Sequence, residues 1–187
     1  YELFASTFNY RQTVFSAFLD AIKQHRSNQI IVEDTQREPL TYRQLLLRSF
    51  ILGGVIRRLT TSREHVGLLL PNTLALVVSF LALQYLGRVP AMLNFTAGVQ
   101  GIRRACTTGE VKRIFTSRTF VERAQLEGLI DGISDHVEII YLEDLRATIG
   151  LKDKLLALLR SCRPARHYQR QLDNTDPDAP AVILFTS

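Results

Sequence analysis

Two hydroxyl-bearing residues, Thr186 and Ser187, directly follow an apolar run at the end of the chain. The run, residues 181–185 (AVILF), predicts a buried strand. Natural chain ends usually lie at the surface and fray, whereas this core strand is followed by only two residues. In α/β proteins, ligands bind at the carboxyl ends of strands. We therefore predict that the strand leads into a ligand-binding loop, most of which lies beyond these 187 residues.

A second group of polar and aromatic residues, Asn94, Phe95 and Thr96, follows an expected strand at 89–93. A ligand could be held there for the same topological reason. Helix capping by Thr96 and core packing of Phe95 explain the residues equally well, and we favour that structural interpretation.

A third candidate is the basic, amphipathic stretch 152–160, which is followed by Arg163, Arg166 and Arg170. Such a helix can lie on an anionic membrane surface or meet an acidic carrier protein. A solvated helix face followed by a linker is the interpretation that we prefer.

Nucleophilic and metal-assisted chemistry finds little support among the cysteines and acidic residues. Cys106 and Cys162 share no metal-ligand spacing with a histidine, and two reduced thiols are expected. Asp34, Glu143 and Asp144 have no evident histidine or cysteine partner, so the sequence indicates no carboxylate or metal site.

The elements that must position these residues alternate between strands and helices. Strands are expected at 29–32, 66–70, 89–93, 112–116, 137–142 and 181–185, and helices at 11–25, 41–59, 73–86, 96–108, 117–126 and within 144–160. Thr41 and Gln44 form a predicted capping box, and Leu59 is expected on the buried face of the helix that follows.

Strands separated by helices predict an α/β fold, with a mostly parallel sheet covered by helices on both faces. We divide the chain into an α/β subdomain at 1–160, a polar loop or linker at 161–180 and the final strand with its loop start at 181–187.

Composition excludes several classes of protein. The chain is 46% apolar and 22% charged, which is typical of a soluble globular protein. A net charge of +5 favours acidic partners, although simple solubility explains it as well. Lys/Arg runs with interleaved aromatic residues are absent, which disfavours nucleic-acid binding. The longest apolar stretch, 74–86, is shorter than the roughly 20 residues of a membrane span and predicts a buried helix.

Four segments, taken in order, resemble the adenylate-forming superfamily. They are residues 40–45 (LTYRQL), 66–72 (VGLLLPN), 87–91 (GRVPA) and 183–187 (ILFTS). In that superfamily the last strand enters a Gly/Ser/Thr-rich loop that ends in Pro-Lys-Gly and binds ATP phosphates. The resemblance places Thr186 and Ser187 at the first two positions of that phosphate-binding loop.

The chain is most similar to the synthetase half of bacterial bifunctional 2-acylglycerophosphoethanolamine acyltransferase/acyl-carrier-protein synthetases, through residues 90–98, 110–118, 141–145 and 183–187. Residues 126–136 and 146–180 match poorly, and Phe95 stands where that family often has Tyr. The acyltransferase half of the family uses a His followed five positions later by Asp. None of the four histidines fits that pattern: His25, His65, His136 and His167.

This resemblance implies that the intact enzyme uses ATP and Mg²⁺ to make an acyl-adenylate from a fatty acid. It then transfers the acyl group to acyl carrier protein, in phospholipid remodelling at the cytoplasmic side of the bacterial inner membrane. The present residues are expected to be soluble, to hold no catalytic residue or metal ligand, to bind no cofactor and to be inactive alone. Membrane association is expected through other parts of the parent protein.

Two alternatives stay open. A fatty acyl-CoA ligase would differ only in its thiol acceptor, and a non-catalytic α/β module could bind a partner or a membrane through residues 152–170.

Overall fold

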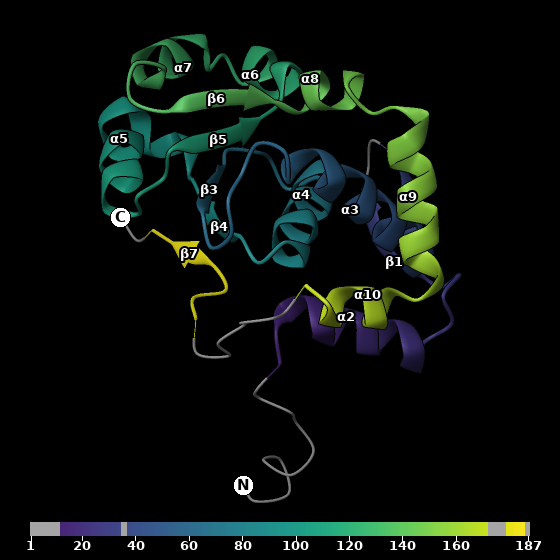
Figure 1. The fold of residues 1–187 in the computed structure, drawn as a ribbon. Coiled ribbons are helices and arrows are strands. Elements are labelled where there is room, and N and C mark those ends of the chain that lie inside the picture. Colours follow the sequence, from purple (N-terminus) through teal and green to yellow (C-terminus); the bar gives the residue numbers. More distant parts are fainter. Residues whose placement is uncertain (1–11, 35–36, 172–178, 186–187) are drawn as a thin grey trace, which may run out of the picture.

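A sheet of five parallel strands organises the molecule, which confirms the predicted α/β class (Figure 1). The computed structural model describes residues 12–34, 37–171 and 179–185. The strand order is β6-β5-β3-β4-β7, and every pairing is parallel. The strands are β3 (His65–Leu68), β4 (Val89–Met92), β5 (Arg113–Thr116), β6 (Glu138–Tyr141) and β7 (Ile183–Leu184).

Helices cover both faces of the sheet, as the sequence predicts (Figure 1). The core on one face includes residues of α3 (Tyr42–Ile56), α4 (Leu74–Tyr85), α8 (Leu142–Ala147) and α9 (Leu151–Cys162), and α9 packs on α3. The other face packs against α5 (Gly98–Thr108), α6 (Arg118–Arg123) and α7 (Glu127–Ile133). Successive residues of a strand point to opposite faces. Leu68 and Phe115 accordingly lie in the first core, and their neighbours Leu69 and Ile114 in the second.

Local signals position several helix ends correctly. The Thr41 side chain accepts from the Gln44 N–H, and Gln44 Oε1 accepts from the Thr41 N–H, so the predicted capping box starts α3. Ser117 caps α6, and Gly109 ends α5. The predicted cap at Thr96 is wrong. Asn94 instead accepts from the Thr96 N–H and starts the short 3-10 helix η1 (Phe95–Ala97), and α5 begins only at Gly98.

The sequence misses elements whose formation depends on distant partners. The segment between the predicted strand at 29–32 and the predicted helix at 41–59 contains β2 (Arg37–Thr41), which pairs antiparallel with β1 (Ile30–Asp34). Helix α7 also went unpredicted. The prediction for Leu59 is wrong, because α3 ends at Ile56 and the Leu59 side chain is exposed.

Part of the range 161–180, predicted as a loop or linker, is helical. Residues Pro164–Gln169 form α10, which starts at a proline, a residue well suited to the first turn of a helix. Its Tyr168 is buried and shares a hydrogen bond of 2.8 Å with Thr13, the N-cap of α2 (Val14–Gln24). Packing against α2 therefore stabilises a segment whose composition indicates a linker.

The final strand also differs from its prediction. Only Ile183 and Leu184 pair, with β4 as their partner at the edge of the sheet, and Leu184 is exposed. None of the helices in the described ranges has the length and apolar character needed to cross a bilayer.

Candidate functional site at the carboxyl edge of the sheet

The five parallel strands end close to the same level, so the loops that follow them lie along one edge. In register, Leu68 of β3 faces Met92 of β4 and Phe115 of β5, and Met92 faces Leu184 of β7. Helices from adjacent strands leave toward opposite faces: α4 follows β3 into the first core, whereas α6 follows β5 into the second. Such a divergence opens a crevice at the carboxyl ends of the strands, where α/β proteins bind ligands.

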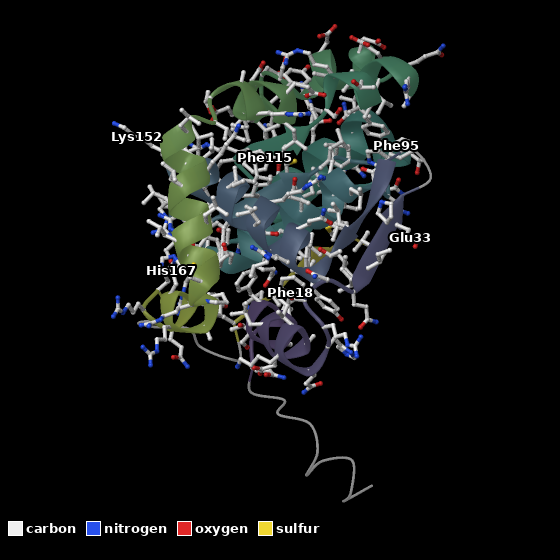
Figure 2. The ribbon with its side chains drawn as sticks, turned by 90° about the vertical axis from the view of Figure 1, so that its right-hand side faces the viewer. Phe18, Glu33, Phe95, Phe115, Lys152 and His167 are labelled. Atoms are coloured by element: carbon white, nitrogen blue, oxygen red, sulfur yellow. The ribbon has the colours of Figure 1, made fainter. Side chains whose placement is uncertain are left out.

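Hydrogen bonds fix the floor of this edge. Leu69, just beyond β3, donates its N–H to the Phe115 carbonyl at 3.0 Å, and its own carbonyl accepts from the Thr116 hydroxyl at 2.8 Å. Thr116 is fully buried, and the Phe115 ring lies in the interior between the layers (Figure 2). The ends of β3 and β5 therefore form a rigid base for the loops above them.

The segment after β4 is held by its own side chains. Asn94 Oδ1 accepts from the Thr96 N–H at 3.0 Å and from the Thr96 hydroxyl at 2.9 Å. Phe95 packs edge-on against Phe120 of α6, with 5.3 Å between the ring centres. These contacts support the structural interpretation of all three residues, although Asn94 rather than Thr96 is the capping residue.

The loops after β5 and β6 are joined by polar contacts. The Ser117 hydroxyl donates to Glu143 Oε1 at 2.7 Å. Arg118 donates to both carboxylate oxygens of Asp144, at 2.7 and 2.8 Å, and its guanidinium lies 4.2 Å from the centre of the Tyr141 ring. Glu143 and Asp144, which the sequence left without partners, thus connect the first turns of α6 and α8.

The electrostatics of these carboxylates match a structural role. Burial raises the pKa of Glu143, but hydrogen bonds from Ser117 and nearby backbone N–H groups outweigh burial and leave the pKa lowered. The hydrogen bonds and charge of Arg118 lower the pKa of Asp144. Both groups are therefore ionised at neutral pH. Both oxygens of Asp144 are engaged by Arg118, whereas Glu143 is engaged through Oε1 and its Oε2 is buried without a hydrogen-bond partner.

Strand β7 ends at this edge, because it pairs in parallel with β4. Phe185 packs into the second core beside Gly109, where a Cβ atom would lie 3.0 Å from the Phe185 ring. The Gln84 amide donates to the Ala181 carbonyl and fixes the segment that leads into the strand. Thr186 and Ser187, the predicted cofactor-binding residues, lie outside the described residues, so their role stays a prediction.

Within 12–34, 37–171 and 179–185, histidine, cysteine and acidic residues form no group able to hold a metal ion. The described residues therefore do not fit a Mg²⁺ site, and we derive no step through a metal from them. The structure brings together the carboxyl ends of β3, β4, β5 and β7, which form the base of the candidate site. Thr116 was missed at the sequence level because no local signal marks a buried hydroxyl that bonds across strands.

A family model described as AMP-binding enzyme matches residues 18–187, nearly the whole chain. The chain belongs to the AMP-binding enzyme family. This finding confirms the predicted superfamily, but it does not distinguish the acyl-carrier-protein synthetases from other members.

Solved structures share the fold of the chain. VinN in complex with 3-methylaspartate matches with a TM-score of 0.69 at 18% identity, over 94% of this chain and 44% of that chain. The N-terminal domain of FACL13 from Mycobacterium tuberculosis matches with a TM-score of 0.62 at 18% identity, over 73% and 35% of the two chains. A benzoate CoA ligase from Burkholderia xenovorans LB400 matches with a TM-score of 0.60 at 18% identity, over 76% and 29%.

The chain thus spans less than half the length of these structures. Its α/β fold corresponds to the N-terminal part of adenylate-forming enzymes.

Proposed function

We propose that the chain is the front part of an ATP-dependent acyl-activating enzyme whose substrate is a fatty acid. The carboxylate of the fatty acid displaces pyrophosphate from ATP and forms an acyl-adenylate. A thiol then attacks the acyl carbon, and AMP leaves. The chemical logic is activation of a leaving group, because a carboxylate is a poor electrophile and its mixed anhydride with AMP is a good one.

The observation that carries this proposal is the position of β7. The strand pairs in parallel with β4, so the carboxyl end of β7 lies at the same edge of the sheet as the carboxyl end of β4. Backbone N–H groups and hydroxyls of a loop at such an edge are suited to hold phosphate oxygens. Membership of the AMP-binding enzyme family supports a nucleotide as the ligand.

The acceptor that we propose is the phosphopantetheine thiol of acyl carrier protein, because residues 90–98, 110–118, 141–145 and 183–187 resemble acyl-carrier-protein synthetases. In the intact enzyme, ATP would be used with Mg²⁺, whose ligands would come from residues outside the described ranges. We further propose that the parent protein works at the cytoplasmic side of the bacterial inner membrane in phospholipid remodelling.

Coenzyme A is the second candidate acceptor. Two of the solved structures that share the fold are a benzoate CoA ligase and an anthranilate CoA ligase, the latter in complex with anthranoyl-AMP. Incubation of the full-length parent with ATP, a fatty acid and either acyl carrier protein or coenzyme A, followed by mass spectrometry of the products, separates the two acceptors.

Adenylation itself is tested by fatty-acid-dependent exchange between pyrophosphate and ATP. We expect exchange by the full-length parent and none by residues 1–187 alone. Turnover by the 187 residues would contradict the view that the remaining machinery lies downstream. Absence of exchange in the parent with any fatty acid would overturn the proposal.

A substitution at Gly109 tests whether the packing of Phe185, the residue after β7, supports the reaction. Gly109→Ala would place a methyl group 3.0 Å from the Phe185 ring and 3.0 Å from the Ala105 carbonyl, so the ring must move. These neighbours must shift by a few tenths of an ångström, and because catalysis depends on accurate positioning of the bound groups, we expect exchange to fall about two- to fivefold. Gly128→Ala is the matched control, because a Cβ there meets nothing within 4 Å. Equal exchange rates for the two variants would show that the packing of Phe185 after β7 does not influence the reaction.

A further inference from the structure

Helix α9 exposes an unusual concentration of leucine side chains. The leucine face of α9 consists of Leu151, Leu155, Leu156, Leu158 and Leu159, which are between 47% and 78% exposed. These five are nearly half of the eleven large apolar side chains that are exposed in the described residues. Such a concentration on one short helix marks an interaction surface, whereas scattered exposed leucines would not.

The orientation of α9 follows from its packing on α3. Ala157 is fully buried, and Asp153 forms an ion pair with Arg58 just beyond the end of α3. Leucines at 151, 155, 158 and 159 repeat at helical spacing and therefore share the opposite face. Figure 1 shows α9 at the periphery of the molecule, and Lys152 projects outward from it in Figure 2.

Cations flank this face. On a helical projection, Lys154 borders the leucines beyond Leu158, whereas Lys152 lies between Leu159 and Leu156, and both lysines are exposed. Arg163, Arg166 and Arg170 continue the positive charge along the end of α9 and α10, and all three are exposed. The acidic residue of α9, Asp153, is neutralised by Arg58.

The surrounding field is positive as well. Burial lowers the pKa of His167 on α10, and the charges of Arg160, Arg57 and Arg170 lower it further. A second copy of the chain would bring two such basic faces together, which like-charge repulsion opposes. An apolar strip bordered by cations is complementary to a surface that is apolar inside and negatively charged at its rim.

We propose that the leucine face of α9 docks onto an anionic phospholipid surface, with the helix axis parallel to the membrane plane. The leucines enter the boundary between headgroups and acyl chains, and Lys152, Lys154 and Arg163 contact the phosphates. A helix of 12 residues is about 18 Å long, which suits an interfacial helix and not a span. This proposal stands independently of the proposed enzymatic activity.

The chain offers a reporter for a direct test. Cys162 is exposed and lies on the leucine side of α9, whereas Cys106 is buried and burial raises the pKa of its thiol to about 11. A polarity-sensitive maleimide at neutral pH will therefore label Cys162 selectively. The experiment uses the full-length parent, with any cysteine outside these residues replaced by serine.

Vesicles that contain roughly one third phosphatidylglycerol are expected to shift the probe emission to shorter wavelength, and neutral phosphatidylcholine vesicles to leave it unchanged. Leu159→Ser should weaken vesicle binding about tenfold. Leu184→Ser, whose side chain is equally exposed at 69%, should leave the binding unchanged. Lys152→Gln should weaken binding about fivefold, in contrast to the exposed control Lys112→Gln.

Three outcomes would overturn the proposal. Protection of Cys162 from labelling in the full-length parent would show that another part of the same protein covers α9. An emission shift of equal size with neutral vesicles would show that the cations do not contribute to membrane binding. A shift produced by an acidic carrier protein and not by anionic vesicles would assign the surface to a protein partner.

Discussion

At the scale of single residues, three side chains form a closed set of hydrogen bonds: Tyr85, His167 and Gln171. Tyr85 Oη lies 2.7 Å from His167 Nε2 and 2.6 Å from Gln171 Nε2, and the two nitrogens of His167 and Gln171 lie 2.7 Å apart. Because an amide nitrogen donates, His167 Nε2 must accept, which requires a neutral imidazole. Arg57 adds a positive charge beside this group by donating to Gln171 Oε1 at 2.6 Å.

This arrangement predicts an acid-sensitive contribution to stability. Burial and the neighbouring arginines lower the pKa of His167 in the folded chain, so the unfolded chain binds the proton more readily. The resulting loss of stability is absent above the pKa of His167 in the unfolded chain. It develops as pH falls through that pKa toward the lower pKa of the folded chain. From about pH 7 to about pH 5, we expect the free energy of unfolding to fall more steeply in the natural chain than in His167→Gln, by at most about 1.4 kcal/mol per pH unit.

Urea denaturation at several pH values measures this difference. His136→Gln is the matched control, because His136 is exposed. Identical pH profiles for the natural chain and His167→Gln would exclude a neutral, half-buried His167.

At the scale of elements, two helices of the same core begin in different ways. At the N-terminus of α3, Thr41 and Gln44 satisfy each other's backbone N–H groups. At the N-terminus of α4, Thr73 makes no capping bond, and its hydroxyl donates to the Pro71 carbonyl at 3.3 Å. Helix α4 is therefore held mainly by its apolar contacts, which lie on most of its sides.

The pair provides an internal comparison of capping. We expect Thr41→Ala to lower the free energy of unfolding by about 1 kcal/mol, because the Gln44 N–H loses its acceptor. Thr73→Ala should change it by less than about 0.5 kcal/mol. Thermal or urea denaturation of both variants measures these values, and equal losses would show that the capping box contributes nothing specific.

At the scale of the whole molecule, Phe15 connects the amino-terminal helix to the remainder of the fold. Its ring is fully buried and lies 6.0 Å from Phe50 of α3, 5.4 Å from Tyr85 of α4 and 4.8 Å from Tyr168 of α10, measured between ring centres. Residues from both ends of the described chain therefore share one aromatic cluster.

Loss of this ring should destabilise the molecule as a unit. Phe15→Ala is expected to lower the free energy of unfolding by about 3–5 kcal/mol, through lost burial and the cavity that remains. The adjacent Val14 is 39% exposed, and Val14→Ala should have an effect below about 0.5 kcal/mol. A single unfolding transition followed by both fluorescence and circular dichroism checks cooperativity. Unfolding of α2 and α10 at lower urea than the sheet would contradict a common core.

The sequence by itself determined the alternation of strands and helices, the parallel α/β class and the start of α3 at Thr41. These features depend on side-chain periodicity and on hydrogen bonds between residues a few positions apart, so the sequence displays them directly. Resemblance of ordered segments also identified the superfamily, which the match over residues 18–187 confirms. Of the candidate site, the sequence indicated the carboxyl end of the last strand, whereas the roles of Thr186 and Ser187 stay predictions.

Tertiary structure alone decided the features that join distant residues. The pairing of β2 with β1, the packing of α10 on α2, and the Thr116 bond to Leu69 each bring together groups that no local pattern connects. The exposed leucine face of α9 belongs to the same class, since the spacing of its leucines predicts an apolar face but not which face packs on α3. Burial and long-range hydrogen bonding depend on the whole fold, and that is why these features are visible only once the chain is folded.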